Sequence, residues 1–328
     1  MSKLVTIFGG SGFLGRYIAR RMAKEGWRVR VACRRPNEAL FVKTYGTVGQ
    51  VEPLFCNIRD DASVLAAIAG ADAVVNCVGT FDKGGRNNFD AVQAEGAGRI
   101  ARIAADSGTS SLVHVSAIGA EASSDCDYAR TKAEGEAAVL SAFPTAMILR
   151  PSVMFGAEDG FYNRFAAMSR LGPILPLVGA ETRFQPVYVD DVAQAAVAGI
   201  QGRAQGVYEL GGPVAATFRT LMAEMLTVIN RRRLLLNMPF WKARIIASVL
   251  DFTSFVTGGL ISNTILTRDQ VKSLRQDNVV ADGAKGLPDL GIAATPALAI
   301  LPDYLWRFRP AGQYDSIKAS ARNLREPG

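Results

Sequence analysis

The sequence predicts an α/β fold built on a doubly wound parallel sheet, and three observations support this prediction. Over the first two-thirds of the chain, short β-branched runs alternate with longer helical patterns, as in a parallel sheet covered by helices on both faces. A glycine triplet stands where the first strand turns into the first helix. The chain has 328 residues, 49% of them hydrophobic, which is enough for a large core without disulfides.

Six strands and four helices are expected before residue 150. The strands are apolar runs bounded by turn residues, at 4–8, 29–33, 51–56, 73–78, 112–115 and 146–149. The helices lie between them, at 13–25, 62–69, 88–106 and 127–142. A ligand of such a fold binds beyond the carboxyl ends of the strands, so we expect the functional residues there.

The alternation loosens after Pro151, where further prolines separate shorter elements. We therefore predict a first domain at 1–212, which contains the sheet, and a smaller region at 213–328. Residues from about 155–185 are expected to contribute to that smaller region, which would serve for docking or for a substrate.

The cysteines and the histidine exclude several kinds of site. Cys33, Cys56, Cys77 and Cys126 show no CxxC spacing, so we expect reduced core thiols in a cytosol-like compartment. His114 is the single histidine, which excludes a multi-histidine metal site, and its apolar run predicts a core or cofactor-neighbouring residue rather than a catalytic base. We predict no metal site.

The net charge is +7 and the pI is near 9.4, which favours an acidic partner or an anionic surface. Nucleic acid is not expected, because no known reading module is present. The sequence has no uninterrupted run of about 20 apolar residues, so no membrane-spanning helix is expected. The chain passes from "MSK" into the first strand, so neither a signal peptide nor a transit segment is expected.

The stretch "VTIFGGSGFLGRYIARRM" predicts a dinucleotide site. Gly9, Gly12 and Gly15 lie between the first strand and the first helix, where backbone amides can approach a pyrophosphate. A side chain on Gly12 would exclude the phosphate. Ser11, Phe13 and Leu14 complete the predicted contact loop.

The second strand ends in "VACRRP", where Cys33 takes the place of the acidic residue that binds the ribose hydroxyls of NAD. The arginines that follow, Arg34 and Arg35, are suited to a 2′-phosphate, so NADP(H) is favoured. The alternative is that both arginines are merely solvated.

In "YARTK", Tyr128 and Lys132 are four residues apart and share one face of a helix. Such a pair is often surface decoration. A fixed ammonium beside a phenol would instead lower the phenol's pKa from about 10 toward the working range of a general acid and base.

Together these motifs resemble an extended or atypical short-chain dehydrogenase/reductase, with a Rossmann domain over roughly residues 4–212. The resemblance also includes "NIRD", "VVNCVG", "HVSA", "LRPSVMFG" and "VYVDDVA". It implies that Tyr128 is the general acid and base, that Lys132 binds the nicotinamide ribose, and that Ser116 orients a substrate. Further cofactor contacts are implied at Asn57 and Ile58 beside the adenine, and at Val78, Gly79, Pro151, Ser152 and Val153 around the nicotinamide.

Two features depart from that family. Ala117 and Ile118 stand where extended members carry a run of hydroxyl residues, and Gln93 stands in place of an expected asparagine. The Tyr128–Lys132 pair is intact but its surroundings are altered, which makes turnover of a small substrate less expected.

A second resemblance is narrower. The stretch "LTRDQVKSLRQDNVV", at 266–280, together with "YARTKAEGE" and "VYVDDVAQA", is similar to the NADPH-binding accessory subunits of respiratory complex I. It implies NADPH held as a structural element, other complex I subunits as partners, and a peripheral position. That position would be the cytoplasmic face of the inner membrane in a bacterium, or the matrix side in a mitochondrion. A working reductase or epimerase and an NADP-sensing regulator remain alternatives.

The stretch at 231–256 bears on docking. It carries five cationic residues between Arg231 and Arg244, and its apolar residues recur at helical spacing, at Trp241, Ile245, Val249, Phe252 and Val256. Such a segment can dock on an acidic protein or lie in a membrane interface, and a core helix with a basic edge is the alternative.

Overall fold

The structure is a computed structural model that describes residues 2–80, 85–245, 248 and 268–314. The chain divides into two compact units. Unit 1 comprises Met1–Ser152, Val189–Gly211 and Val280–Ala294, and unit 2 comprises Val153–Tyr188, Gly212–Val279 and Thr295–Gly328. The division predicted from the sequence, at 212/213, stays a prediction, because compactness does not establish independent folding.

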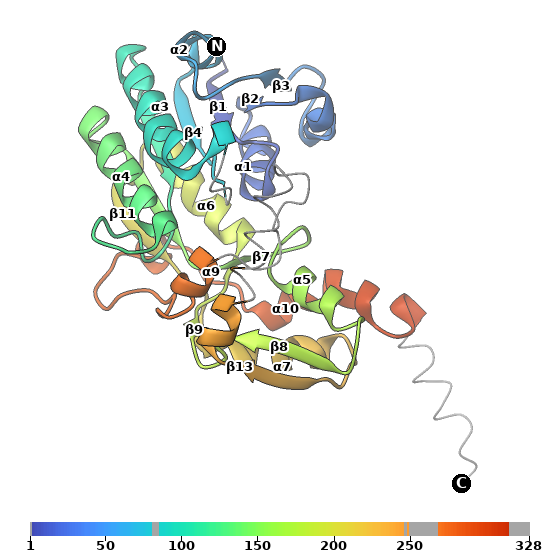
Figure 1. Ribbon diagram of the computed structural model, residues 1–328. Helices are drawn as coiled ribbons and strands as arrows, with labels where there is room; N and C mark the ends of the chain where they lie inside the picture. The colour runs from blue at the N-terminus through green and yellow to red at the C-terminus, as the bar shows by residue number, and fades with distance from the viewer. Residues whose placement is uncertain (1, 81–84, 246–247, 249–267, 315–328) are drawn as a thin grey trace. The chain divides into compact units, whose positions relative to one another are not determined.

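Unit 1 is built on a seven-stranded parallel sheet with the order β11-β6-β5-β4-β1-β2-β3 (Figure 1). The prediction of a doubly wound parallel sheet is confirmed. The strand order reverses direction between β1 and β4, which is where open α/β sheets bind their ligands. The strands are β1 (Leu4–Phe8), β2 (Arg28–Cys33), β3 (Val51–Phe55), β4 (Ala73–Asn76), β5 (Ser111–Val115), β6 (Met147–Pro151) and β11 (Gly206–Leu210).

The helices of unit 1 cover both faces of the sheet. On one side α1 packs against α6, and on the other α2, α3 and α4 pack side by side (Figure 1). Their bounds are α1 (Phe13–Lys24), α2 (Asp61–Ile68), α3 (Glu95–Asp106), α4 (Asp127–Ala142) and α6 (Val189–Ile200). A 3-10 helix, η1 (Pro36–Tyr45), follows β2.

One predicted helix differs in its first part. Residues 88–106 were expected to form a single α-helix, but Asp90–Ala94 forms a π-helical turn, η3, before α3 begins. The side chain of Gln93, in this turn, is buried. π-Helical turns are rare and recur near functional sites, because they rotate the following residues out of the α-helical register.

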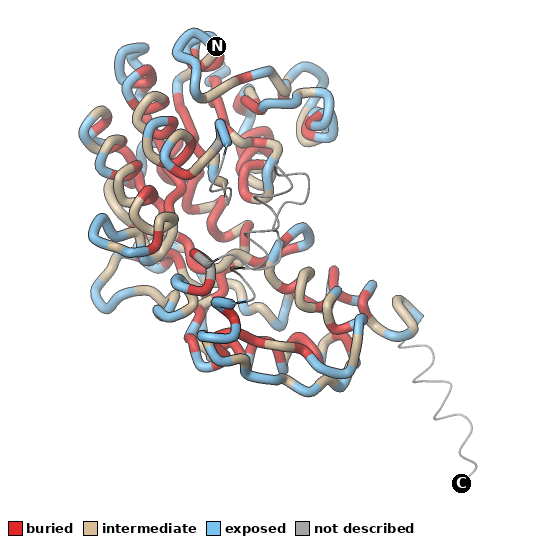
Figure 2. The backbone as a smooth tube through the Cα atoms, in the orientation of Figure 1, coloured by how far each residue is buried: buried red, intermediate tan, exposed pale blue. Residues whose placement is uncertain are grey.

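The core of unit 1 lies on the sheet, whose central strands are buried along their length (Figure 2). Five-residue runs that are buried on both faces explain why these strands are continuously apolar in the sequence. Helix α6 lies very close to the sheet, since a Cβ on Gly199 would lie 2.6 Å from Met147 Sδ and 2.7 Å from Val113 Cγ2. A larger residue at 199 would push α6 off the sheet.

Unit 2 is built from two-stranded sheets and short helices around an aromatic core. Phe161, Phe165 and Phe218 lie within one cluster, with the Phe165 and Phe218 ring centroids 5.1 Å apart. The strand pairs are β7 (Met154–Phe155) with β10 (Val187–Tyr188), β8 (Ile174–Val178) with β13 (Leu234–Met238), and β9 (Arg183–Phe184) with β12 (Ala216–Thr217). The helices are α5 (Tyr162–Met168), α7 (Phe218–Val228), α9 (Arg268–Ser273) and α10 (Ala297–Leu305). Short 3-10 turns complete the described chain.

A buried carboxylate joins two parts of unit 2. Asp159 accepts backbone hydrogen bonds from Phe161 and Asn163, both at 3.0 Å, and a 2.5 Å hydrogen bond from the Tyr304 hydroxyl. Burial raises the pKa of Asp159, and these donors oppose that change. The carboxylate therefore fixes the turn before α5 to α10.

The basic segment at 231–256 lies only partly within the described residues. Its first part forms β13, and residues 240–245 are helical, with Trp241 and Ile245 more than half exposed. Val249, Phe252 and Val256 lie outside the described residues, as do residues 266 and 267 of the second motif. Within the described parts of the chain, no helix combines the length and the apolar character needed to cross a bilayer.

Candidate functional site

The glycine loop after β1 has a backbone that requires glycine at two positions. Gly9 has a φ of +72°, in the left-handed region, and its amide donates to Ala32 O at 2.9 Å. A Cβ on Gly15 would lie 2.6 Å from Gly10 Cα and would also overlap the carbonyl oxygen of Gly9. Conformation at Gly9 and close packing at Gly15 therefore bring the end of β1 against the start of α1.

Gly12 has a different reason to be glycine. It is the N-cap of α1 and lies exposed, and no side chain caps the helix. The first amides of an uncapped helix lack partners within the helix and attract anions. Ser11 and Phe13 are half-buried beside it, and Leu14 is buried. This cradle fits a pyrophosphate, and its contacts with one stay a prediction.

The end of β2 carries the predicted 2′-phosphate residues. Arg34 and Arg35 are both exposed, and Arg35 Nη1 lies 3.1 Å from Glu38 Oε1. Burial raises the pKa of the Cys33 thiol. Hydrogen bonds with the Arg35 amide and the Ser11 hydroxyl partly offset that rise. Position 33 holds no carboxylate, whereas a protein that binds the ribose hydroxyls of NAD carries one at the end of this strand.

The loop after β3 holds the two residues expected beside the adenine. The Asn57 amide donates to Ser63 Oγ at 3.0 Å, and Ile58 O accepts from Arg99 Nη1 at 3.1 Å. A Cβ on Gly96 would lie 2.9 Å from Ile58 Cδ1, so α3 packs directly on this loop. Both residues are half-buried and anchored by the helices that follow.

An amide network orders the end of β4. Asn76 Oδ1 accepts from the Val78 amide at 3.0 Å, and Asn76 Nδ2 lies 3.1 Å from His114 Nδ1. Burial lowers the pKa of His114 to about 3, helped by the Lys132 ammonium, so the imidazole is neutral. His114 therefore supports the loop of Val78 and Gly79 and cannot serve as a base near neutral pH.

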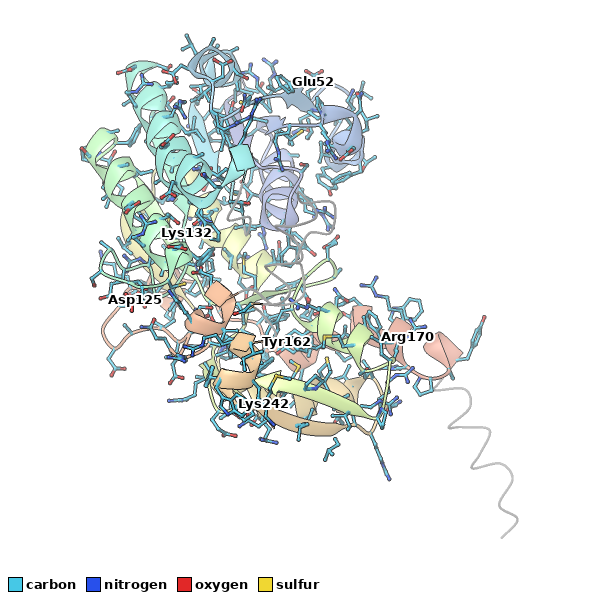
Figure 3. All side chains as sticks on the ribbon, in the orientation of Figure 1. Glu52, Asp125, Lys132, Tyr162, Arg170 and Lys242 are labelled. Carbon is cyan, nitrogen blue, oxygen red and sulfur yellow. The ribbon has the colours of Figure 1, made fainter. Side chains whose placement is uncertain are left out.

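Lys132 is a buried residue of α4 (Figure 3), and its side chain reaches the last residue of β5. Its Nζ donates to Val115 O at 3.0 Å and lies 3.9 Å from where a Cβ on Gly79 would be. Burial lowers the pKa of Lys132 to about 8, and Glu136 and Cys77 oppose that change. The helix thus places an ammonium beside both β4 and β5 at the carboxyl edge of the sheet.

Tyr128 lies one turn before Lys132, and its ring packs edge-on against Phe89 with 6.1 Å between centroids. Burial raises the pKa of Tyr128 to about 12, with Cys126 adding to the effect. The prediction that Lys132 lowers this pKa is wrong in this structure. Lys132 Nζ is 6.0 Å from the Tyr128 ring centroid, and burial, which disfavours the phenolate, is the largest cause of the raised pKa.

Ser116 carries a buried, unsatisfied hydroxyl just after β5. Its side chain is 4% exposed, and its Oγ has no hydrogen-bond partner among the described residues. Leaving a buried hydroxyl unsatisfied costs about 1–3 kcal/mol. A polar ligand atom at the end of β5 would remove that cost, and Ser116 is predicted to meet one.

Gln93 supports α4, which the sequence did not indicate. Its Nε2 donates to Thr80 O at 2.7 Å, and its Oε1 accepts from Thr131 Oγ1 at 3.2 Å. A Cβ on Gly135 would overlap the carbonyl oxygen of Gln93, so α4 lies in close contact with the π-helical turn. Gln93 therefore fixes the helix that carries Tyr128 and Lys132.

The segment after β6 crosses from one unit into the other. Pro151 O accepts from the Ile118 amide at 3.2 Å, and the Ser152 amide donates to Leu210 O at 2.8 Å. Val153 begins unit 2, where its amide donates to Asn278 Oδ1 at 3.1 Å. The predicted roles of Pro151, Ser152 and Val153 around a nicotinamide stay predictions.

The residues of unit 1 fit a nicotinamide dinucleotide. The uncapped N-terminus of α1 follows the carboxyl end of β1. The unsatisfied hydroxyl of Ser116 follows the carboxyl end of β5, and the buried Lys132 on α4 reaches the same end of that strand. A nicotinamide, when bound, supplies hydride transfer. No group of three or more histidine, cysteine or acidic side chains is placed to bind a metal within the described ranges.

Comparison with known sequences decides the family. The sequence profile of the NAD dependent epimerase/dehydratase family matches residues 5–211. The chain belongs to this family. That membership and the geometry of the cradle support a nicotinamide dinucleotide as the cofactor.

The chain is also similar over most of its length to subunits of a respiratory enzyme. It is 35% identical over 316 residues to the Arabidopsis thaliana protein named NADH dehydrogenase [ubiquinone] 1 alpha subcomplex subunit 9, mitochondrial, covering 94% of this chain and 79% of that protein. It is 31% identical over 323 residues to the Neurospora crassa NADH-ubiquinone oxidoreductase 40 kDa subunit, mitochondrial, covering 98% and 84%. The predicted resemblance to complex I accessory subunits is confirmed.

A solved structure confirms the fold. The Bordetella bronchiseptica enzyme WbmH, in complex with NAD⁺, superimposes with a TM-score of 0.66 at 17% identity, covering 95% of this chain and 100% of that one. At this identity the likeness is one of fold alone. It agrees with the predicted Rossmann fold.

Proposed function

We propose that this chain is a nucleotide-binding accessory subunit of a respiratory NADH:ubiquinone oxidoreductase, in which the nucleotide serves structure and assembly. One observation carries the proposal. The match to the epimerase/dehydratase family ends at residue 211, whereas the similarity to the Arabidopsis and Neurospora subunits covers 94% and 98% of the chain. Much of unit 2 is therefore similar to the respiratory subunits but lies outside the match to the epimerase/dehydratase family.

The nucleotide in this proposal is NADPH. Two exposed arginines, Arg34 and Arg35, follow a strand whose last residue is Cys33 rather than an acid. Guanidinium groups bind a 2′-phosphate in a bidentate geometry, and a carboxylate at position 33 would repel it. The missing acid and the added cations favour the phosphorylated nucleotide over NADH.

The subunit would be peripheral. Its relatives are named as mitochondrial, and we propose the matrix face in that setting and the cytoplasmic face of the inner membrane in a bacterium. The segment at 231–245 is a candidate for docking. It holds three consecutive arginines and the exposed Trp241 and Ile245, a combination that suits an acidic protein surface or a membrane interface.

A working NADPH-dependent reductase is the second candidate. The unsatisfied Ser116 hydroxyl favours it, because a substrate oxygen could accept its hydrogen bond. The three residues that the short-chain dehydrogenase resemblance names as catalytic are also all present. Gln93 supports α4 rather than weakening it, which removes one argument against turnover. The raised pKa of Tyr128 argues the other way, since a phenol with a pKa of about 12 is a weak proton donor at neutral pH.

Purification from native membranes tests the proposal. The chain, tagged at its natural locus, is solubilised in mild detergent and separated by size. We expect it to travel with NADH:quinone oxidoreductase activity in constant ratio and to carry NADPH after denaturation. Recovery as a free protein that reduces carbonyl compounds with NADPH would assign it to the reductases. A free protein that exchanges nucleotide rapidly and reduces nothing would point to an NADP sensor.

A further inference from the structure

Five arginines of unit 2 lie around the ends of α5 and α7. Arg233 Nε donates to Ser169 O, just after α5, at 2.6 Å, and Arg170 is the residue that follows Ser169 (Figure 3). This hydrogen bond brings the chain after α7 to the end of α5. The arginine cluster consists of Arg170, Arg231, Arg232, Arg233 and Arg309.

Hydrogen bonds also tie the cluster to α7 and to η5 (Trp306–Phe308). Arg231 Nε donates to Phe308 O at 2.7 Å, and Arg309 Nε donates to Val228 O, in the last residue of α7, at 3.0 Å. Arginine side chains commonly bind the last carbonyl oxygens of a helix, where the partial charge is negative. The two segments therefore hold each other, and their guanidinium groups are fixed near one another.

No carboxylate pairs with the arginine cluster within the part of the chain that the structure describes. The hydrogen bonds of its guanidinium groups go to main-chain oxygens there. Burial lowers the pKa of Arg231, and the charges of Arg233 and Arg170 lower it further. A guanidinium stays charged in a protein, so these like charges repel one another, and an anion beside them would relieve that repulsion.

Exposed aliphatic side chains lie directly beside the cluster. Leu171 and Leu234 each follow one of its arginines, and they are 88% and 63% exposed. The Leu234 amide donates to Pro173 O at 2.9 Å, which holds the start of β13 to the loop that carries Leu171. Leu234 lies opposite Ile174 in the β8–β13 pair, so both point to one face, and alternation places the exposed Leu236 there too.

We propose that the arginine cluster and this apolar patch, formed by Leu171, Ile174, Leu234 and Leu236, are one surface that binds the interface of an anionic phospholipid bilayer. The guanidinium groups meet the lipid phosphates, and the aliphatic side chains enter the boundary between headgroups and acyl chains. The inference rests on the peripheral position in the proposed function and commits it to a lipid surface. An acidic protein fits less well, because leucine is under-represented among the residues that dominate protein interfaces.

Cosedimentation of the purified full-length chain with vesicles tests the inference. Vesicles of phosphatidylcholine alone are compared with vesicles in which about one-third of the lipid is phosphatidylglycerol. We expect the chain to bind the anionic vesicles at low ionic strength and to bind phosphatidylcholine at least about tenfold more weakly, and we expect salt to release it. Equal binding to the two compositions, or binding to neither, would overturn the inference.

Single substitutions locate the surface. Arg170 and Arg232 are exposed, so Arg170→Gln and Arg232→Gln should keep the fold and each weaken binding to anionic vesicles by about fivefold. Arg203→Gln removes the same charge from an exposed position of unit 1 and should bind as the wild type does. Leu171→Ser should also weaken binding, and Leu65→Ser, at an exposed leucine of α2, should not.

The contrary results for these variants are equally clear. A loss in Arg203→Gln as large as that in Arg170→Gln would mean that net charge alone attracts the chain, and unchanged binding in Leu171→Ser would exclude the apolar patch. Either result overturns the proposed surface. Thermal unfolding of every variant identifies any that loses binding because it loses its fold, and Leu171→Thr then replaces a misfolded Leu171→Ser.

Other partners and the proposed function are tested separately. Inorganic phosphate at matched ionic strength should leave vesicle binding unchanged, and displacement by it would make the cluster a site for free phosphate. Variants that bind vesicles normally but no longer travel with the oxidoreductase would show that the surface meets a protein instead. A wild-type chain that travels with the oxidoreductase without binding vesicles refutes this inference alone, and the reverse result refutes the assembly role alone.

Discussion

Lys132 Nζ donates a 3.0 Å hydrogen bond to the main-chain oxygen of Val115, the last residue of β5. The bond fixes a 5%-exposed ammonium at the carboxyl edge of the sheet, one residue before the orphaned hydroxyl of Ser116. A carbonyl satisfies one of its three donors, and the nicotinamide ribose is predicted to satisfy another. The charge is therefore predicted to have a role in this protein whether or not Tyr128 transfers protons.

The first prediction follows from the pKa of Lys132, lowered to about 8 in the folded chain against about 10.4 when unfolded. Between these values the unfolded chain binds more protons, so this residue makes stability rise with pH. Cys77 and Tyr128, whose pKa values are raised to about 12, act in the opposite direction at higher pH. We expect the free energy of unfolding of the wild type, relative to Lys132→Met, to increase from pH 8 to about pH 10.

Urea unfolding of the nucleotide-free wild type and of Lys132→Met at several pH values measures this difference. Lys242→Met is a matched control, because Lys242 is an exposed lysine of unit 2 (Figure 3). A flat difference between wild type and Lys132→Met would mean that water reaches the ammonium.

The fold was largely predictable because its signals are local. The first strand and α4 have the predicted bounds, since an apolar run and a helical pattern are complete within their own residues. The π-helical turn was missed, because close packing of Gly135 on the Gln93 carbonyl is a contact between segments about 40 residues apart. A sequence pattern carries no record of such a contact.

The site was predictable in composition but not in electrostatics. The spacing of Tyr128 and Lys132 correctly indicated that they are neighbours, but pKa values depend on burial, which the spacing does not report.

The second prediction concerns Gly12. A valine there places methyl groups at the exposed N-terminus of α1, where a pyrophosphate is predicted to lie, and its Cβ would be 3.1 Å from Gly9 O. We expect Gly12→Val to lose nucleotide and, with it, the stabilisation of about 4 kcal/mol that a ligand gives at a thousandfold excess over its dissociation constant. Thermal unfolding with and without NADPH measures this.

Two outcomes are distinguishable for that variant. If the nucleotide supports the fold, Gly12→Val and wild type differ much more with NADPH than without it, and the variant is scarce in membranes. A variant without nucleotide that still assembles at normal abundance would refute a structural role for the cofactor. Gly26→Ala is not a suitable control, because Gly26 has a φ of +79°. Gly172→Ala is, since an added Cβ there meets nothing within 4 Å.

The third prediction concerns Arg34. Replacing it by aspartate puts a carboxylate beside the predicted 2′-phosphate, so Arg34→Asp should weaken NADPH by at least about tenfold and spare NADH. Titration of the purified chain with both nucleotides measures the ratio. Arg28→Asp is the control, because Arg28 is exposed at the opposite end of the same strand. Equal losses for the two nucleotides would exclude Arg34 from a 2′-phosphate site.

The last prediction separates an accessory subunit from a reductase. In a reductase, Tyr128→Phe removes the proton donor and should lower activity by about a hundredfold or more, with binding preserved. In an accessory subunit the same change removes one hydroxyl and keeps the ring against Phe89. We therefore expect Tyr128→Phe to retain NADPH and to leave NADH oxidation by membranes unchanged.

Lys132→Ala should be the more damaging change, because it deletes the cation that Val115 O holds and leaves a space in the core between β4 and α4. Bound NADPH, the amount of assembled complex and membrane NADH oxidation are measured in both variants and in Tyr17→Phe, a tyrosine on α1 that serves as the control. Loss of nucleotide and complex in Lys132→Ala alone fits a lysine that holds a cofactor. If Tyr128→Phe instead abolishes an NADPH-consuming reaction while retaining its nucleotide, the tyrosine is a working acid and the chain is an enzyme in its own right.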